Sequence, residues 1–234
     1  MWLIAEYEAA SLFSLKLSSA TASGGKTLLV PTPYAIKMAL LDVACRIHGV
    51  AVAEKEWAQI RDLQIAVRPT EHVVVTNLFQ KVLKPRRGEI SLDNPDAGPF
   101  QKTIGYREYA QWVGALGVAF DVGEDQVTWL YDLLLNVNYL GKRGGFVQLL
   151  PPTRAVDALS SDFVAATNTT STFAINGVLQ VLDDCAPSLT FAQANIYEQK
   201  EKPGKGRVTR QIVLPNYRLT RSSKSFSLYE HIGG

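Results

Sequence analysis

The chain has 234 residues, of which 47% are hydrophobic and 20% are charged, and its formal net charge is +2. This composition predicts a substantial core and excludes global disorder. No apolar run approaches the ~18 residues that a transmembrane helix needs. The two cysteines, Cys45 and Cys185, form no Cys-x-x-Cys pair, so neither a disulfide framework nor a zinc site is indicated. We expect no metal or other cofactor. No signal peptide is recognised, and a cytoplasmic protein is the simplest interpretation.

Positive charge is concentrated near the C-terminus. The segment 199–224 contains eight Lys and Arg residues against one Glu, a charge of +7, so the remainder of the chain carries −5. A basic segment on an acidic body favours a polyanionic partner, and Arg207 and Arg210 are candidate contacts for it. A solvated loop followed by a lysine-rich edge strand is the alternative.

The first 50 residues predict two strands and a helix. Residues 2–8 and 12–17 have the apolar and aromatic content of strands. Thr32 then occupies the position of a helix N-cap and Pro33 that of the first helical residue. Apolar residues recur after it at helical spacing, so the helix should extend to about His48.

The start of this helix is a candidate phosphate site. Lys26 and Lys37 lie on either side of it, and backbone N–H groups and the helix dipole should face outward at residues 32–35. An ordinary amphipathic helix, whose cap binds nothing, has the same pattern. The Gly-Lys-Thr triplet at 25–27 is not a P-loop, because Ala20 stands where that motif requires glycine.

A shorter helix at 53–63 and strands at 64–67 and 72–79 are expected next. Residues 80–106 lack helical periodicity and contain three prolines and three glycines, so we interpret them as a long excursion, such as a β-hairpin with a mobile tip. Its cations and aromatic residues suit single-stranded nucleic acid, and an insertion without contacts is the alternative. The candidate contacts in and just after it are Lys81, Lys84, Arg86, Arg87, Lys102 and Arg107.

The chain then returns to the body. We predict a strand at 117–122, a helix from Glu124 to near Gly141, and a strand at 147–150 that Pro151-Pro152 closes. Lys142 and Arg143 lie in the glycine-rich loop between this helix and strand, where backbone could approach a sugar–phosphate chain closely.

The last third of the chain is predicted to be mostly β, with strands at 173–182, 189–198, 207–214 and 225–229. The whole pattern is α+β. Residues 1–150 fit a ferredoxin-like β-α-β-β-α-β core with an insertion at about 80–106, and residues 151–234 form a smaller β-rich part.

Four stretches resemble the CRISPR-associated Cas-five family of the RAMP superfamily, whose core is also described as RRM-like. They are the Pro-Thr-Pro-Tyr-x-x-Lys-x-x-Leu-Leu run at 31–41, the Phe-x-x-x-Ile-x-Tyr-Arg-Glu-Tyr run at 100–109, the glycine-rich loop and strand at 140–150, and the pair of runs at 213–215 and 226–229. Their order and spacing carry the resemblance.

This resemblance implies a non-catalytic RNA-binding subunit of a type I CRISPR Cascade ribonucleoprotein, an antiviral defence complex. Such a subunit binds and caps the 5′ handle of the CRISPR RNA (crRNA), contacts the backbone and large subunits, and meets target DNA only indirectly, with no membrane partner. It implies three RNA-binding groups: a helix-start group, a group on the insertion that we call the thumb, and a loop group. Their members are Lys26, Tyr34 and Lys37; Lys81, Lys84, Arg86 and Arg87; and Lys142 and Arg143.

Two alternatives remain open at this point. Some members of the family cut precursor crRNA, so the chain could be a metal-independent endoribonuclease. Metal-free cleavage needs a base, an acid and charge stabilisation. No Lys–His–Tyr cluster is visible in the sequence, although folding could assemble one from Tyr34, Lys37 and His48. A stand-alone protein that binds single-stranded RNA is the second alternative.

Overall fold

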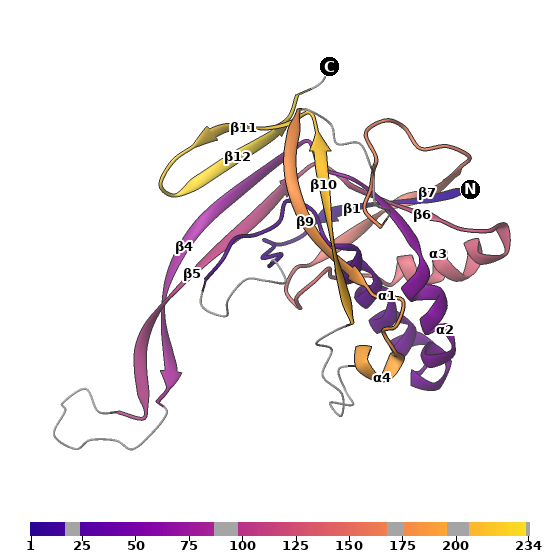
Figure 1. Ribbon diagram of the computed structural model, residues 1–234, viewed down its shortest axis with the longest axis horizontal. Coiled ribbons are helices and arrows are strands. Elements are labelled where there is room, and N and C mark those ends of the chain that lie inside the picture. Colours follow the sequence, from indigo (N-terminus) through magenta and orange to yellow (C-terminus); the bar gives the residue numbers. More distant parts are fainter. Residues whose placement is uncertain (17–23, 87–97, 168–175, 196–205, 233–234) are drawn as a thin grey trace.

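The structure is a computed structural model that describes residues 1–16, 24–86, 98–167, 176–195 and 206–232. It contains α-helices and mainly antiparallel sheets, in agreement with the α+β prediction (Figure 1). One sheet has the strand order β7-β1-β6-β3-β8, and every neighbouring pair in it is antiparallel. The elements of this part are β1 (Trp2–Ala9), α1 (Pro33–Ile47), α2 (Val50–Asp62), β3 (Gln64–Arg68), β6 (Leu116–Asp121), α3 (Val127–Leu135), β7 (Val147–Val156) and β8 (Val164–Ala165).

Helix α1 begins as the sequence predicts. The Thr32 hydroxyl accepts a hydrogen bond from the Ala35 N–H at 3.1 Å, and Pro33 follows the cap. The buried face of the helix includes Ile36, Leu40 and Val43, which lie three and four residues apart and therefore share one side. This face packs into the main hydrophobic core of the molecule.

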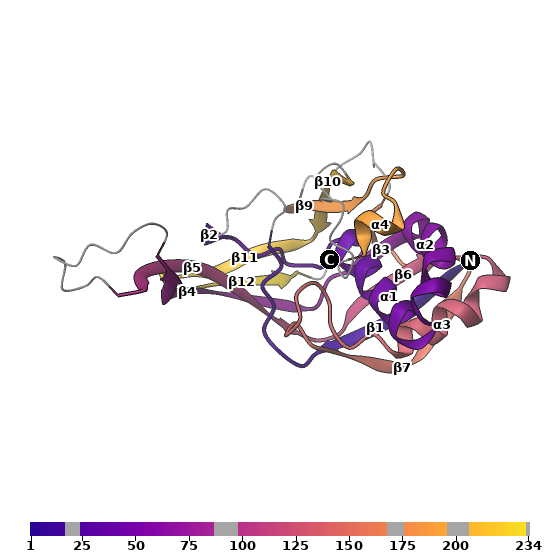
Figure 2. The same ribbon diagram turned by 90° about the horizontal axis from the view of Figure 1, so that it is seen from below.

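The predicted excursion is a β-hairpin that we call the thumb, formed by β4 (His72–Pro85) and β5 (Phe100–Val113). Its base lies in the core, where Val73 and Trp112 are buried, and its far half projects away from the helices as a long arm (Figures 1 and 2). The hairpin therefore includes the predicted strand at 72–79 and extends to residue 113, so it is longer than the excursion predicted at 80–106. Residues 87–97, including Arg87, lie outside the described residues.

Strands after residue 150 pair both with one another and with earlier strands. Two of them, β9 (Gly177–Cys185) and β10 (Arg207–Pro215), pair into a two-stranded ribbon, and α1 contacts β9. The others, β11 (Tyr217–Ser222) and β12 (Phe226–His231), extend the thumb sheet, whose order is β11-β12-β4-β5-β2 with β2 at Gly24–Gly25. The division of the chain into two parts at residue 150 stays a prediction. Buried residues of both parts belong to the same hydrophobic core cluster.

Two strand predictions are wrong. Residues 12–16 make only isolated bridges, Phe13 with Ala110 and Lys16 with Thr27. Of the predicted strand at 189–198, residues 191–194 form a short helix, α4 (Phe191–Ala194), and residues 196–198 lie outside the described part. A capping box starts α4, because Thr190 and Gln193 each bond to the other's backbone N–H.

Two boundaries also differ from prediction. The predicted helix at 124–141 is a 3-10 turn, η1 (Glu124–Gln126), followed by α3, which already ends at Leu135. Pro151-Pro152 does not close the strand, and β7 continues through a cis peptide bond there to Val156. Proline is tolerated here because β7 is an edge strand. No strand in the described part of the chain pairs with its outer side, so the missing proline N–H groups cost no hydrogen bonds on that side.

A buried ion pair joins α1 to β9. The Lys37 Nζ donates to the Asp184 carboxylate at 2.7 Å, and the two side chains are only 2% and 4% exposed. The same carboxylate accepts from the Cys185 N–H at 2.7 Å, and Arg210 of β10 lies 3.8 Å from its second oxygen. The pair therefore holds the N-terminal part of α1 against the β9–β10 ribbon.

Breaking this pair should strongly destabilise the fold. We expect Asp184→Asn to lower the free energy of unfolding by about 3–5 kcal/mol, because the Lys37 ammonium is left buried without its counter-charge. The double variant Lys37→Met/Asp184→Asn should recover most of the loss, since the asparagine can still accept from the Cys185 N–H. Urea unfolding measures both, with the exposed Glu54→Ala as control. A double variant no more stable than the single one would contradict this account.

Candidate functional site

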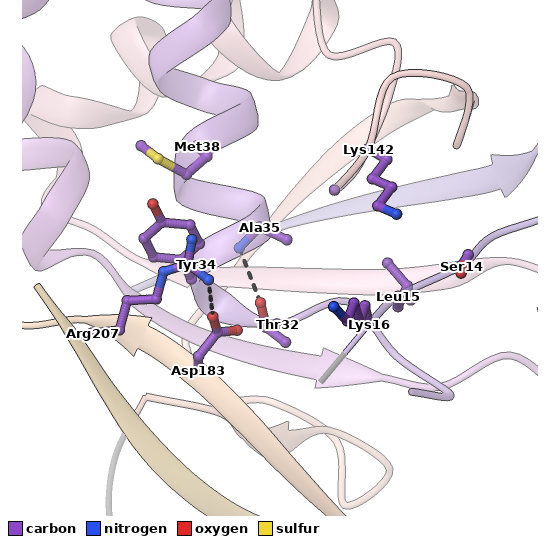
Figure 3. Close-up of a pocket in the computed structure, with 11 residues that line it drawn as sticks. Ser14, Leu15, Lys16, Thr32, Tyr34, Ala35, Met38, Lys142, Asp183 and Arg207 are labelled. Atoms are coloured by element: carbon purple, nitrogen blue, oxygen red, sulfur yellow. Dashed lines mark hydrogen bonds and ion pairs between the residues drawn. The ribbon is translucent and has the colours of Figure 1, made fainter. Parts of the chain in front are cut away.

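A cavity of about 370 Å³ lies at the start of α1 (Figure 3). Its cations come from three segments that are far apart in the sequence: Lys16 from the stretch after β1, Lys142 from the loop before β7, and Arg207 from β10. Tyr34 of α1 also lines it. Figure 3 shows Arg207 and Tyr34 on one side of the cavity and the two lysines on the other.

The Arg207 guanidinium is held by two contacts. It lies 3.7 Å from the centroid of the Tyr34 ring, within range of a cation–π interaction, and it donates to the Asp183 carboxylate at 2.8 Å. Burial raises the pKa of the Tyr34 hydroxyl, although the neighbouring Arg207 charge opposes this rise. The tyrosine therefore stays neutral at physiological pH and presents an aromatic ring rather than a negative charge.

Positive charge is crowded around Lys142. Partial removal from water lowers the pKa of its ammonium, and the nearby charges of Arg107 and Lys16 lower it further. Arg107 comes from β5 and Lys16 from the segment after β1, so the fold brings both of these cations close to Lys142. An anion bound there would relieve their mutual repulsion.

The helix start contributes less to this site than the sequence suggested. Pro33 has no N–H, and the N–H of Ala35 is already used by the Thr32 cap. The expectation that several backbone N–H groups face outward at 32–35 is therefore wrong in part. The cationic side chains supply most of the attraction for an anion, with the helix dipole adding to it.

Backbone conformation and packing within the chain both explain why the 141–145 loop contains glycines. Gly141 and Gly144 have φ angles of 76° and 108°, a region that favours glycine. At Gly145 a Cβ atom would come within 3.0 Å of the Phe13 ring, which itself stacks on Trp112 with centroids 4.0 Å apart. These glycines thus shape the loop so that its exposed Lys142 reaches the cavity, whereas sequence reasoning assigned them to close approach by RNA.

Of the helix-start group, only Tyr34 lines the cavity. Lys37 cannot contact RNA, since it is buried and paired with Asp184, so its assignment as a binding residue is wrong. Lys26 is exposed beside β2 but does not line the cavity. Arg210 belongs to the ion network around Asp184. Sequence reasoning missed Lys16, which it had assigned to a strand, and no local signal identifies it.

The thumb carries the second set of predicted residues. Lys81, Lys84 and Lys102 are exposed along its two strands, and Arg86 follows β4. Lys81 and Lys102 lie on one face of the hairpin, because their cross-strand partners are Ile104 and Leu83 at successive positions of that face. Arg107 lies nearer the body, beside Lys142.

The three residues considered for RNA cleavage do not meet. Tyr34 is at the start of α1 and His48 is its C-cap, about 21 Å further along the helix axis at 1.5 Å per residue. His48 lies 3.1 Å from Glu56, and Lys37 is enclosed.

Arg143 is exposed in the loop beyond the cavity, near Tyr139. Among the described residues, no cluster of three or more His, Cys, Asp or Glu could hold a metal ion. The helices in that part of the chain are too short or too polar to cross a membrane.

The crowding around Lys142 predicts a stability gain when its charge is removed. Partial burial and the neighbouring charges of Arg107 and Lys16 lower the pKa of Lys142, so the unfolded state binds the proton more tightly. The destabilisation from the charged ammonium is therefore fully present at neutral pH and fades as pH rises through the lysine range. We expect Lys142→Gln to raise the melting temperature slightly at pH 7, and to lose this advantage at alkaline pH. The exposed Lys55→Gln on α2 is the matched control. An equal effect of both changes, or a fall in melting temperature for Lys142→Gln, would contradict the prediction.

Comparison with known proteins identifies a curated relative whose sequence is similar to this chain over most of its length. A curated protein described as CRISPR-associated protein Cas5, from Archaeoglobus fulgidus, is 23% identical over 222 residues, covering 92% of each chain. No family model matches. Two solved structures are similar: a CRISPR protein from Archaeoglobus fulgidus, with TM-score 0.49, 12% identity and coverage of 99% of this chain and 92% of the other, and a Cas protein, with TM-score 0.39, 16% identity and coverage of 92% and 95%. The resemblance to the Cas-five family is confirmed by the similarity in sequence to the Cas5 protein.

Proposed function

We propose that this protein is a non-catalytic RNA-binding subunit of a type I CRISPR Cascade complex, where it holds the 5′ handle of crRNA. The observation that carries the proposal is the cavity at the start of α1, which is lined by the three cations Lys16, Lys142 and Arg207 and by the aromatic ring of Tyr34. Cations bind the phosphates of single-stranded RNA without regard to sequence, and an aromatic face can stack on a base. The relative that matches 92% of the chain is described as a CRISPR-associated Cas5 protein.

The core supports the same proposal. Its elements follow one another as strand, two helices, strand, strand, helix, strand, and the sheet order of these strands is β7-β1-β6-β3 with antiparallel neighbours. Numbered along the core, that is the order 4-1-3-2. We infer a ferredoxin-like RAMP core, with the thumb inserted between its second and third strands.

The thumb supports contact with a neighbouring subunit and with RNA near it. One of its faces exposes four large apolar side chains beside Lys81 and Lys102: Phe79 at 65%, Leu83 at 62%, Phe100 at 52% and Ile104 at 66% exposure. A contiguous exposed apolar surface of this kind is typical of an interaction site rather than of a solvated loop. We therefore assign the cavity to handle binding and the thumb to the junction with the backbone subunit.

No observation favours the endoribonuclease alternative. A cleavage site would need a base and an acid within hydrogen-bond reach of the same phosphodiester. The described part of the chain places His48 about 21 Å from Tyr34 along α1 and encloses Lys37. The cytoplasmic location expected from the sequence stays a prediction.

A comparison of two double variants tests the division of labour. Lys16→Ala/Lys142→Ala should weaken binding of handle RNA and reduce the salt slope of binding by about 1.4, at roughly 0.7 per phosphate contact. Lys81→Ala/Lys102→Ala should instead lower the yield of assembled complex while handle binding largely persists. Filter binding over a salt series measures the first effect, and co-purification with the other subunits measures the second.

Lys55→Ala, an exposed position on α2 that lines neither the cavity nor the thumb, serves as the charge control for both measurements. Equal losses of handle binding and assembly in both double variants would mean that the positive charges act as one diffuse field, and the two separate sites would be wrong. Recovery of many unrelated RNAs on a monomer would favour a stand-alone RNA-binding protein.

The absence of nuclease activity is a separate prediction. Purified protein incubated with repeat-containing precursor RNA, with and without EDTA, should leave the RNA intact on a denaturing gel. The physical reason is the distance between the residues that would have to act as acid and base. Specific cutting within the repeat that is lost in Tyr34→Phe or His48→Ala would overturn the non-catalytic assignment.

A further inference from the structure

A second cavity of about 250 Å³ adjoins the cationic one. The two share Tyr34, Met38, Gly141 and Arg207 as lining residues, so the stacked pair of Arg207 on Tyr34 forms part of the boundary between them. The three cations Lys16, Lys142 and Arg207 face the first cavity, and of these only Arg207 reaches the second. The two spaces are therefore adjacent but differ in chemistry.

The lining of the second cavity is mainly apolar and aromatic. It includes Ala39, Leu41, Cys45, Tyr139 and Ala194, contributed by α1, the segment after α3, and α4. Burial raises the pKa values of the Cys45 thiol and the Tyr139 hydroxyl, and the charge of Asp42 adds to both shifts. Both groups are thus neutral at physiological pH, and the pocket can accept an uncharged planar group.

One carboxylate faces this space. Asp42 lines the second cavity, and its side chain is 12% exposed. Arg46, one turn later on α1, donates to Asp42 at 2.9 Å and to the Asn136 carbonyl at 3.0 Å, which fixes the position of the carboxylate. An ionised carboxylate accepts hydrogen bonds and donates none, so it favours an occupant that carries an N–H donor.

We propose that the second cavity takes one unpaired base of the bound RNA, while the phosphate attached to that nucleotide lies among the cations of the first cavity. This inference rests on the proposed RNA-binding function and adds a base pocket to it. A cationic compartment beside a smaller, mainly apolar one matches the two halves of a nucleotide. The base stacks against the aromatic lining, and its exocyclic amino group donates to Asp42. Adenine and cytosine have such a group, whereas uracil presents a carbonyl oxygen in its place.

Four probes of equal length test the proposal on the full chain: oligoadenylate, oligocytidylate, oligouridylate and an abasic ribose-phosphate oligomer. Oligoadenylate and oligocytidylate should bind more tightly than the abasic oligomer by roughly 5- to 150-fold, the contribution of one stacked base. Oligocytidylate should also bind more tightly than oligouridylate, and this pair is the sharper comparison because both are pyrimidines. The comparison needs no variant, so a folding defect cannot obscure it.

Three variants then separate the two cavities. Cys45→Leu, which fills only the second cavity, should bring oligocytidylate down to the affinity of the abasic oligomer and leave abasic binding unchanged. Asp42→Asn should remove the preference for cytosine over uracil. Lys16→Ala, which changes only the first cavity, should weaken all four probes alike. In the unaltered chain, oligoadenylate should protect the half-buried Cys45 from alkylation, and the abasic oligomer should not.

The results distinguish failure of the pocket from failure of the function. Equal binding of oligocytidylate and the abasic oligomer, with both weakened by Lys16→Ala, would overturn the base pocket and leave the proposed function standing. Base-dependent binding without preference between cytosine and uracil would overturn the role of Asp42. If none of the four probes binds, the proposed function and this inference both fail.

Discussion

The ion pair between Lys37 and Asp184 fixes helix α1 against the β9–β10 ribbon, and these elements carry Tyr34 and Arg207 of the candidate site. Two charges with at most 4% exposure are stable only because they meet at 2.7 Å with further hydrogen bonds to the carboxylate. The pair holds the N-terminal part of α1 against β9, and β10 is paired with β9 along its whole length. The positions of Tyr34, on α1, and Arg207, on β10, both follow from this connection.

Neighbouring carboxylates on β9 serve two different purposes. Successive residues of a strand point to opposite faces, so Asp184 faces Lys37 while Asp183 faces Arg207. The first is enclosed and structural. The second holds a guanidinium that remains 40% exposed at the cavity and lies over an aromatic ring. The Asp183-Asp184 dipeptide thus anchors the fold and orients the guanidinium that we propose as an RNA contact.

The cations of this chain divide according to how much they stabilise the fold. Lys37 is enclosed and paired, and its loss should be costly. Lys142 is exposed among like charges, and its removal should raise stability. A residue retained against the stability of the fold is typical of a functional site. The proposed anion site coincides with this repulsion, because a phosphate bound there would supply a counter-charge to Lys142, Arg107 and Lys16.

The same distinction applies to the thumb. Its base is held by buried residues such as Val73 and Trp112, whereas its outer half exposes Phe79, Leu83 and Ile104 to solvent. An arm that contributes few core contacts and presents large apolar side chains gains little from folding alone. Its surface is understandable when a partner covers it, which is the role assigned to it here.

The sequence by itself determined the elements that depend on neighbouring residues. Thr32 and Pro33 define the start of α1, because the Thr32 hydroxyl accepts a hydrogen bond from the N–H three residues later. Prolines, glycines and the lack of helical periodicity indicate the thumb, and the α+β class follows from the order of the elements. The prediction of a strand at 189–198 did not take into account the capping box that Thr190 and Gln193 form. Tertiary structure alone decided that Lys37 meets Asp184, 147 residues away, and that Lys16, Lys142 and Arg207 share one cavity. Local propensity acts over a few residues, whereas the burial and pairing of a charge depend on segments that only the folded chain brings together.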